Sequence, residues 1–390
     1  MADNTNTIKQ IVRDNARQYG MIIALIVIIL FFYILTGGVL LSPLNVTNIV
    51  LQNSYILILT VGMLPLILLG KFDLSVGSVA AFVGAVAAIL TVKFHMPFVP
   101  VLLIGLGLGA LIGVWQGIWI AYVGVPAFVA TLSSMLLFRG LTIAVLDGRS
   151  IGPFSDSFKA LSSSYLPDFF GFGPLHLTTI MIGLLACVFI FIKIFQTRAE
   201  NKKYGFDVLP LAFDVIKAVL ISAGVMIFIS FFALYKGLPT VMILVAALII
   251  IYTYITNNTV LGRRIYAQGG NERAALLSGI RTKLLNMFAF INVGVLSALA
   301  GMVFAARLNA GTPKAGNGFE LDAIASCFIG GASASGGEGT VIGAIIGALI
   351  MGIMNNGMSI MGISIDLQQS IKGLILLLAV AFDVYTKSRK

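Results

Sequence analysis

Residues 269–280, Gly-Gly-Asn-Glu-Arg-Ala-Ala-Leu-Leu-Ser-Gly-Ile, form one of the few polar stretches in a strongly hydrophobic chain. Asn271 is a good helix N-cap, because its side-chain oxygen can accept a hydrogen bond from the free backbone N–H groups of the first turn. Glu272 places a carboxylate at the positive end of the helix dipole, and Gly279 supplies a left-handed stop. We predict a helix of about eight residues, roughly 10–12 Å long, which is too short to cross a membrane.

The surroundings of this short helix indicate a docking element. Its Ala and Ser side chains form a small-residue face, and Arg263, Arg264, Arg273, Arg281 and Lys283 surround it with positive charge. A capped, exposed helix on a basic loop is typical of a segment that binds another protein. The residues predicted to dock are Asn271, Glu272, Arg273, Ala274, Ala275, Ser278 and Gly279.

The rest of the chain has the composition of a membrane protein. Of its 390 residues, 59% are hydrophobic and only 10% are charged, whereas soluble domains have about 25% charged residues. We predict an all-α polytopic membrane protein with about twelve transmembrane helices, because a bilayer needs runs of about 20 apolar residues. The runs lie at about 20–36, 48–69, 74–92, 99–123, 126–146, 176–196, 213–235, 239–257, 283–305, 320–337, 340–361 and 365–385, and the tenth is short and glycine-rich.

The distribution of positive charge predicts the topology. With the N-terminus inside, 16 Lys and Arg residues fall on the inner segments and 6 on the outer ones. Cytoplasmic loops carry the excess of Lys and Arg, so we predict that both termini are cytoplasmic. The prediction gives a cytoplasmic tail (1–19), a single transmembrane domain (20–390) and a cytoplasmic loop (258–282) that carries the docking helix. The net charge of +10 then reflects topology, and we predict the lipid bilayer but no nucleic acid as a partner.

The sequence contains no pattern that predicts an enzyme. HExxH is absent, and two cysteines and two histidines are too few for a metal site. A phosphate-binding P-loop requires GxxxxGK[ST], and Gly70-Lys71 is followed by Phe72 instead. We therefore predict no catalytic residues, no bound cofactor or metal and no nucleotide site, so that any ATP is hydrolysed by a partner.

Polar residues within the hydrophobic runs are candidates for a transport pathway. Arg139 lies near the middle of a run, where a charged side chain requires a partner or a water-filled face. Amides in such runs can bind a polar solute or join helices, and the sequence leaves both readings open. The predicted pathway residues are Asp73, Ser75, Asn53, Gln116, Arg139, Asn355 and Asn356. Lys372 is expected to extend toward the membrane surface from a helix end, and Glu320 and Asp322 are expected in loops.

Two stretches share a pattern. In residues 68–78 and 328–338, Gly70, Ser75 and Gly77 align with Gly330, Ser335 and Gly337. Matching interruptions in two halves of a transporter indicate an internal repeat around the pathway. The alternative is two ordinary turns that begin helices.

The chain resembles the permeases of bacterial ABC-type monosaccharide importers, the family of the ribose, xylose and galactoside permeases. The resemblance covers nearly the whole chain from about residue 20, and its quoted stretches are 72–78, 262–280, 306–310, 318–324 and 355–357. It implies a bacterial inner-membrane permease that works as a homodimer with an ABC ATPase subunit and a periplasmic or extracellular sugar-binding protein. Within 269–280, it identifies the coupling helix.

Residues 175–235 add two predicted spans to the ten-span core of that family. A similar insertion marks the xylose-type permeases, so the resemblance favours xylose or a related monosaccharide. The alternative function is an autonomous secondary carrier or channel for a small polar solute. That alternative predicts titratable groups inside spans and requires no docking helix. An intramembrane enzyme has no supporting residues.

Overall fold

The computed structural model describes residues 16–171, 175–205, 208 and 210–388, and these ranges contain helices but no β-strand. Most of the predicted cytoplasmic tail, 1–19, lies outside them. The chain divides into two units: 1–40, 49–163 and 241–390 in unit 1, and 41–48 and 164–240 in unit 2.

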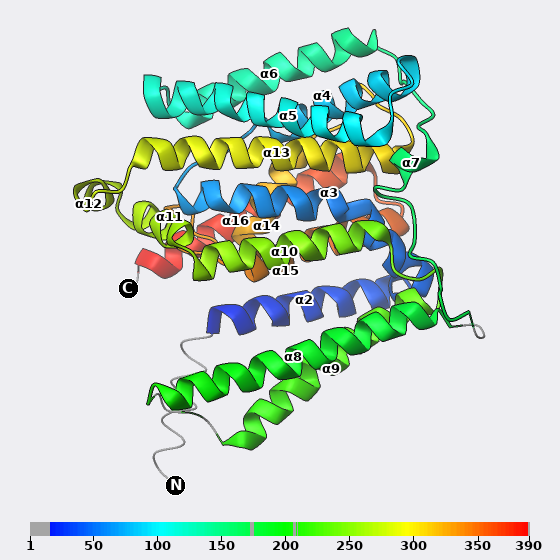
Figure 1. The fold of residues 1–390 in the computed structure, drawn as a ribbon, viewed down its shortest axis with the longest axis vertical. Coiled ribbons are helices and arrows are strands. Elements are labelled where there is room, and N and C mark those ends of the chain that lie inside the picture. Colours follow the sequence, from blue (N-terminus) through cyan, green and yellow to red (C-terminus); the bar gives the residue numbers. More distant parts are fainter. Residues whose placement is uncertain (1–15, 172–174, 206–207, 209, 389–390) are drawn as a thin grey trace. The chain divides into compact units, whose positions relative to one another are not determined.

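Unit 1 is a bundle of long helices (Figure 1). Its helices are α2 (Ala16–Leu35), α3 (Pro43–Leu68, whose first turns belong to unit 2), α4 (Val76–Ala88), α5 (Phe98–Gly117), α6 (Ala127–Leu146), α7 (Asp156–Lys159), α10 (Thr240–Asn258), α11 (Val260–Gly270), α12 (Glu272–Leu277), α13 (Thr282–Leu308), α14 (Phe319–Ile329), α15 (Val341–Ile360) and α16 (Ile365–Ser388). Helices α4 and α5 continue as π-helical segments, Ile89–Lys93 and Ile118–Val123.

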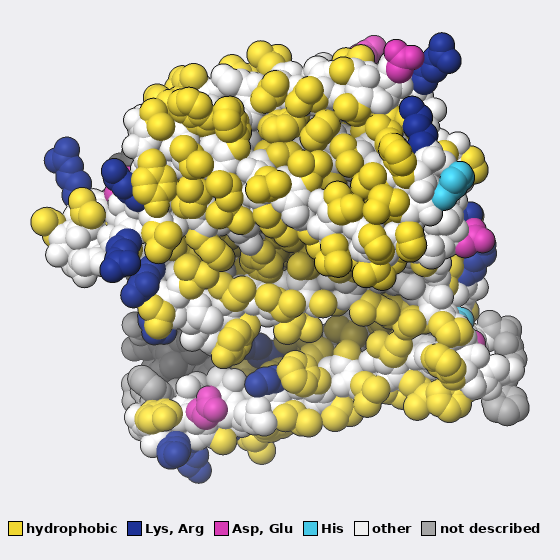
Figure 2. Space-filling model, turned by 45° about the horizontal axis from the view of Figure 1, so that its top comes forward, with side chains coloured by type: hydrophobic (Ala, Val, Ile, Leu, Met, Phe, Trp, Pro, Cys, Tyr) yellow, Lys and Arg dark blue, Asp and Glu magenta, His cyan; other side chains and the backbone are white. Residues whose placement is uncertain are grey.

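The centre of unit 1 depends on small residues that let α13 lie close to α4 and α5. A Cβ atom on Gly294 of α13 would lie 2.3 Å from the Gly109 carbonyl oxygen, and one on Gly301 would lie 2.0 Å from that of Ala80. Close backbone approach at small residues is a principal way in which helices associate within a membrane. The charged side chains on the face over α4–α6 lie mainly at its two ends (Figure 2), as expected for a surface that faces lipid.

Unit 2 contains the helix pair α8 (Leu177–Lys203) and α9 (Leu211–Ala233). Gly183 lets α8 approach Ile229 and Met226 of α9, and Arg198 forms an ion pair with Asp214 near the other end of the pair. This pair coincides with the predicted insertion at 175–235, whose origin as an insertion stays a prediction.

The described helices agree with the predicted polytopic all-α class. Nine of them are long and apolar enough to cross a membrane. The tenth predicted run, 320–337, differs from a full span: α14 has 11 residues and is followed by a glycine-rich turn. At 1.5 Å per residue α14 is about 16 Å long, or roughly half the hydrocarbon thickness. Its first turn lies inside unit 1, because Asp322 is buried and Glu320 is partly buried.

Candidate functional site

Helix α12 projects from one end of unit 1, the end at which α2 begins and α16 finishes (Figure 1). The expected cap is present, since Asn271 Oδ1 accepts a hydrogen bond of 2.9 Å from the Ala274 N–H. Gly279 has φ +84°, the left-handed conformation expected at the stop. The helix is shorter than predicted, with six residues rather than about eight.

Of the predicted small-residue face of α12, Ala274 and Ser278 are exposed, and only Ala275 departs from the prediction. Ala275 is buried and supports the helix, whereas Leu276 and Leu277 are 59% and 89% exposed. Two exposed leucines on a capped helix form an apolar surface of the kind that interaction sites have. The adjacent pair Leu276-Leu277 in the sequence was the signal for this surface.

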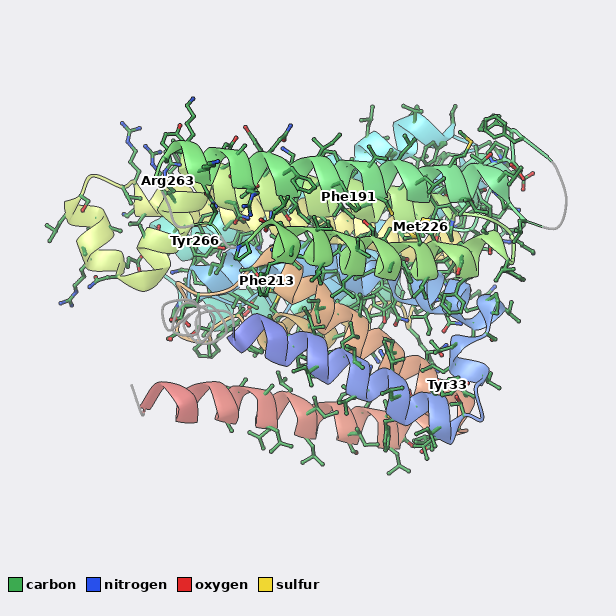
Figure 3. The ribbon with its side chains drawn as sticks, turned by 90° about the horizontal axis from the view of Figure 1, so that it is seen from below. Tyr33, Phe191, Phe213, Met226, Arg263 and Tyr266 are labelled. Carbon is green, nitrogen blue, oxygen red and sulfur yellow. The ribbon has the colours of Figure 1, made fainter. Side chains whose placement is uncertain are left out.

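The base of α12 is the end of α11, the helix that precedes it. Hydrogen bonds fix this base to the bundle (Figure 3, which labels Arg263 and Tyr266). Gln268 Nε2 donates to Asn286 Oδ1 on α13 at 2.9 Å and to Glu272 Oε1 at 3.2 Å. The Tyr266 hydroxyl donates to the Gly339 carbonyl at 2.8 Å, just before α15. A displacement of α12 would therefore pull on both α13 and the start of α15.

The same base meets the two glycine-rich stretches that align in the sequence. The Gly337 N–H donates to the Leu68 carbonyl at 2.8 Å, which joins the stretches directly. A Cβ atom on Gly269 would lie 1.7 Å from that carbonyl oxygen and 2.7 Å from the Gly337 nitrogen. The ends of α3 and α11 and the turn before α15 thus meet backbone to backbone beneath α12. Whether the two stretches are an internal repeat stays a hypothesis.

One group of predicted pathway residues forms a buried network at the start of α4. Asp73 Oδ1 accepts hydrogen bonds from the Ser75 N–H at 2.7 Å and from the Ser75 hydroxyl at 2.6 Å. Gln116 Nε2 on α5 donates to the same Ser75 hydroxyl. All three side chains are essentially fully buried. The network brings together residues from the α3–α4 turn and from α5.

The predicted amides on α3 and α15 lie elsewhere. Asn53 Nδ2 donates to the Ile49 carbonyl at 2.8 Å and to the Gly352 carbonyl on α15 at 3.4 Å. This contact joins two helices, which favours the packing interpretation for Asn53. Asn356 on the same helix is buried, and Asn355 is partly buried.

Arg139 on α6 has the interior partner that its position requires. Its two terminal nitrogens donate to the carbonyl oxygens of Ala315 and Gly316, at 2.6 and 3.2 Å. These carbonyls belong to the non-helical segment 309–318 that connects α13 to α14. Irregular backbone at membrane depth needs such partners, because lipid supplies no hydrogen bonds. Arg139 thereby holds the segment that leads into α14.

The expectation that Glu320 and Asp322 lie in loops was wrong. Both are in the first turn of α14, and Asp322 is buried. The expectation for Lys372 was wrong as well: its Nζ lies 2.9 Å from Asp322 Oδ1 instead of extending toward the membrane surface. Pattern alone did not find these residues, because their environment depends on α6 and α16, far away in sequence.

A cavity of about 310 Å³ lies beside this ion pair. Its polar lining residues are Asn317, Glu320, Asp322, Gln369 and Lys372. The Glu320 carboxylate packs against the start of α4, because a Cβ atom on Gly77 would lie 2.5 Å from its Oε2. The arrangement offers hydrogen-bond donors and acceptors to a small polar molecule inside a largely apolar bundle. No cluster able to hold a metal ion occurs among the described residues.

Comparison with known proteins decides the family. Residues 45–380 match the family model described as "Branched-chain amino acid transport system / permease component". The chain belongs to this permease family. It is therefore a multi-pass inner-membrane subunit of a transporter, and such a permease works with ATPase and substrate-binding subunits.

The permease is similar to curated relatives over nearly its whole length. It is 38% identical to the xylose transport system permease protein XylH of Haemophilus influenzae, over 96% of this chain and 98% of that protein. It is 40% identical to XylH of Escherichia coli K12, over 96% and 93%, and 34% identical to the ribose import permease protein RbsC of Haemophilus influenzae, over 89% and 87%. No solved structure matches the chain.

Proposed function

We propose that this permease carries a monosaccharide, xylose or a related pentose, across the inner membrane of a bacterium, driven by ATP that a partner subunit hydrolyses. The observation that carries the proposal is the sequence identity of 38–40% to two xylose permeases over 96% of the chain. In this proposal the chain binds no nucleotide or other cofactor, two copies form the pathway, and both termini face the cytoplasm with α12.

The contacts beneath α12 support a mechanism for coupling. The exposed leucines of α12 bind the ATPase, and the ATPase moves α12 as it binds and hydrolyses ATP. Because Gly269 lies against Leu68 and Gly337, that movement reaches the α3–α4 turn and the turn before α15. Ser75, on the α3–α4 turn, belongs to the buried network with Gln116. The contacts thus form a continuous path from the docking helix to the interior polar groups.

The interior polar groups support a pathway for a polyhydroxylated solute. A pentose must exchange water for donors and acceptors as it crosses, since unpaired hydroxyls in an apolar medium cost several kcal/mol. Asn317, Glu320, Gln369 and the Lys372–Asp322 pair offer both kinds of group around one cavity. In this proposal Arg139 positions the segment 309–318, and the cavity is part of the sugar's route.

The interior charged residues bear on the alternative of an autonomous carrier. Its predicted signature was titratable groups inside spans, and Glu320, Asp322 and Lys372 supply such groups. Family membership and the exposed docking helix favour the ATP-driven importer nevertheless.

The test is uptake of labelled xylose into proteoliposomes. The permease is reconstituted alone, or with the ATPase of a xylose importer, and the matching binding protein is added outside. We expect uptake only when the ATPase, internal ATP and the binding protein are all present. Uptake by the permease alone in response to a proton or sodium gradient would instead establish the carrier.

A further inference from the structure

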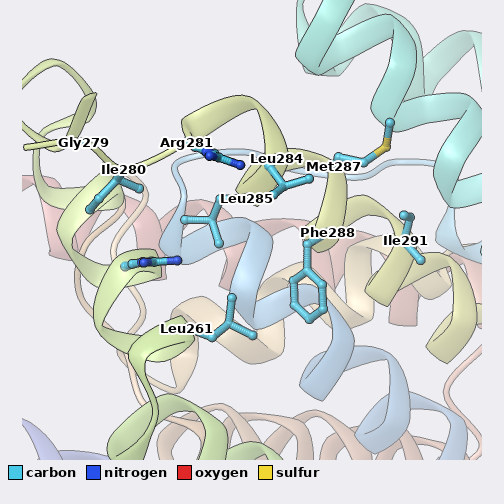
Figure 4. A pocket seen from close by; sticks show the side chains of 10 residues that line it. Leu261, Gly279, Ile280, Arg281, Leu284, Leu285, Met287, Phe288 and Ile291 are labelled. Carbon is cyan, nitrogen blue, oxygen red and sulfur yellow. The ribbon is translucent and has the colours of Figure 1, made fainter. Parts of the chain in front are cut away.

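A second cavity lies beside the docking helix, between α11 and the first half of α13 (Figure 4). Its volume is about 690 Å³. At one end are Arg264, Arg281 and the α12 stop at Gly279, and along α13 its wall is formed by Leu284, Phe288 and Ile291. The coupling contacts and the interior polar network described above do not account for this cavity.

The two arginines at its mouth are available to a ligand. Both are exposed, and neither guanidinium has a hydrogen bond or an ion pair to any residue that the structure describes. Two unpaired guanidinium groups at the rim of one cavity favour an anion, and arginine is well suited to phosphate because its planar fork can donate two parallel hydrogen bonds.

The length of the apolar wall along α13 indicates the chemistry of the rest of the ligand. Residues 284, 288 and 291 have the spacing of one helix face, and Leu284 and Phe288 are 55% and 41% exposed. From Arg281 to Ile291 the helix rises about 15 Å, which is half of the roughly 30 Å hydrocarbon core and thus the depth of one leaflet. An apolar wall that extends one leaflet deep from a cationic mouth fits an acyl chain below a charged headgroup.

We propose that this cavity binds an anionic phospholipid of the leaflet on the α12 side, with its phosphate on Arg264 and Arg281 and an acyl chain along Leu284, Phe288 and Ile291. Basic pockets between membrane helices are known to suit anionic headgroups. A soluble partner can reach the arginines but cannot follow the wall into the hydrocarbon. Since Gly279 and Arg281 flank the junction of α12 with α13, the bound lipid would support the docking helix at its base.

The experiment measures retention of phosphatidylglycerol by the purified full-length permease, using native mass spectrometry and titration with a fluorescent analogue. The test variant is Arg264→Gln/Arg281→Gln. The matched control is Arg263→Gln/Arg273→Gln, which removes the same charge from the same end of the bundle but from residues that do not line the cavity.

We expect the wild type and the control to bind phosphatidylglycerol in preference to phosphatidylcholine of the same chain length. The test variant should bind it roughly 25-fold more weakly, about fivefold for each arginine. Equal loss in both double variants would overturn the specific site. Competition by inorganic phosphate alone would show a free-anion site and would also overturn the proposal.

Photocrosslinking identifies the occupant in the assembled complex. A photoreactive residue replaces Phe288, and the permease is combined with its ATPase in vesicles that contain phosphatidylglycerol. Crosslinks to lipid support the proposal, and crosslinks mainly to the ATPase or to a second permease copy contradict it. This result does not depend on sugar uptake, so it is separate from the fate of the proposed function.

Discussion

Lys372 on α16 and Asp322 in the first turn of α14 form an interior ion pair, with Nζ 2.9 Å from Oδ1. The Asp322 side chain is 4% exposed and that of Lys372 is 23% exposed. The Tyr55 hydroxyl also interacts with the Asp322 carboxylate, and the Tyr55 ring stacks on Phe319 at 3.9 Å between centroids. This pair attaches the short helix α14 to α16 at the edge of the polar cavity.

Replacing one partner of this pair should destabilise the permease. Lys372→Met leaves the Asp322 carboxylate buried without its cation, and we expect a loss of about 3 kcal/mol in the free energy of unfolding. The double variant Lys372→Met/Asp322→Asn should recover most of that loss, because no unpaired charge remains. Thermal unfolding of the purified variants in detergent measures both effects. A single variant as stable as the wild type would show that the pair does not stabilise the fold.

The two hydrogen bonds of Arg139 predict a loss of transport when this residue is replaced. Arg139→Leu leaves the carbonyls of Ala315 and Gly316 without their donors, at a cost of roughly 1.5–3 kcal/mol for each charged hydrogen bond. We expect the segment 309–318 to lose its position and ATP-driven uptake to fall at least tenfold. Arg139→Lys should retain part of the activity through one hydrogen bond. Normal uptake by Arg139→Leu at normal expression would make Arg139 a packing residue outside the pathway.

The contrast between these residues shows what the sequence could predict. The long helices were predictable, because a bilayer accepts few alternatives to runs of about 20 apolar residues. The cap of α12 was predictable for a similar reason, since Asn271 and Gly279 act on backbone only a few residues away.

The burial of the acidic residues in the first turn of α14 was not predictable in this way. Glu320 and Asp322 look like loop residues by composition, and the cation that pairs with Asp322, Lys372, lies on α16, far away in sequence. The face of α12 was predicted only in part, because Ala274 and Ser278 are exposed but Ala275 is buried. Whether Ala275 or Leu277 points outward depends on the contact of α12 with its base, which is tertiary structure.

The exposed leucine at the end of α12 should be essential for partner binding. Leu277 is 89% exposed, and Leu277→Asp places a carboxylate where an apolar contact is expected. Because central apolar contacts dominate interface energies, with losses of about 2 kcal/mol or more, we expect association with the ATPase to weaken at least tenfold. Co-purification of the tagged ATPase with membrane-inserted permease measures this effect.

Glu272 provides the companion test on the same helix. Glu272→Gln keeps an oxygen that can accept from Gln268, so it should preserve both the base of α12 and ATPase binding. Glu272→Arg reverses the charge and removes that acceptor, and it should detach the ATPase while insertion stays normal. Full ATPase retention and normal uptake by Glu272→Arg and Leu277→Asp would exclude α12 as the docking helix.

Substitutions at two neighbouring glycines distinguish the proposed coupling path from a general effect of changing the loop. A methyl group on Gly269 would lie 1.7 Å from the Leu68 carbonyl oxygen, whereas one on Gly270 would meet no atom within 4 Å. Gly269→Ala must therefore push α11 away from the α3–α4 turn, and we expect ATP hydrolysis to continue while sugar uptake falls severalfold. Gly270→Ala should leave both unchanged. The ratio of sugar transported to ATP hydrolysed, measured in the same proteoliposomes, distinguishes the two variants. Equal ratios would mean that movement of α12 reaches the interior by some route other than the backbone contact at Gly269.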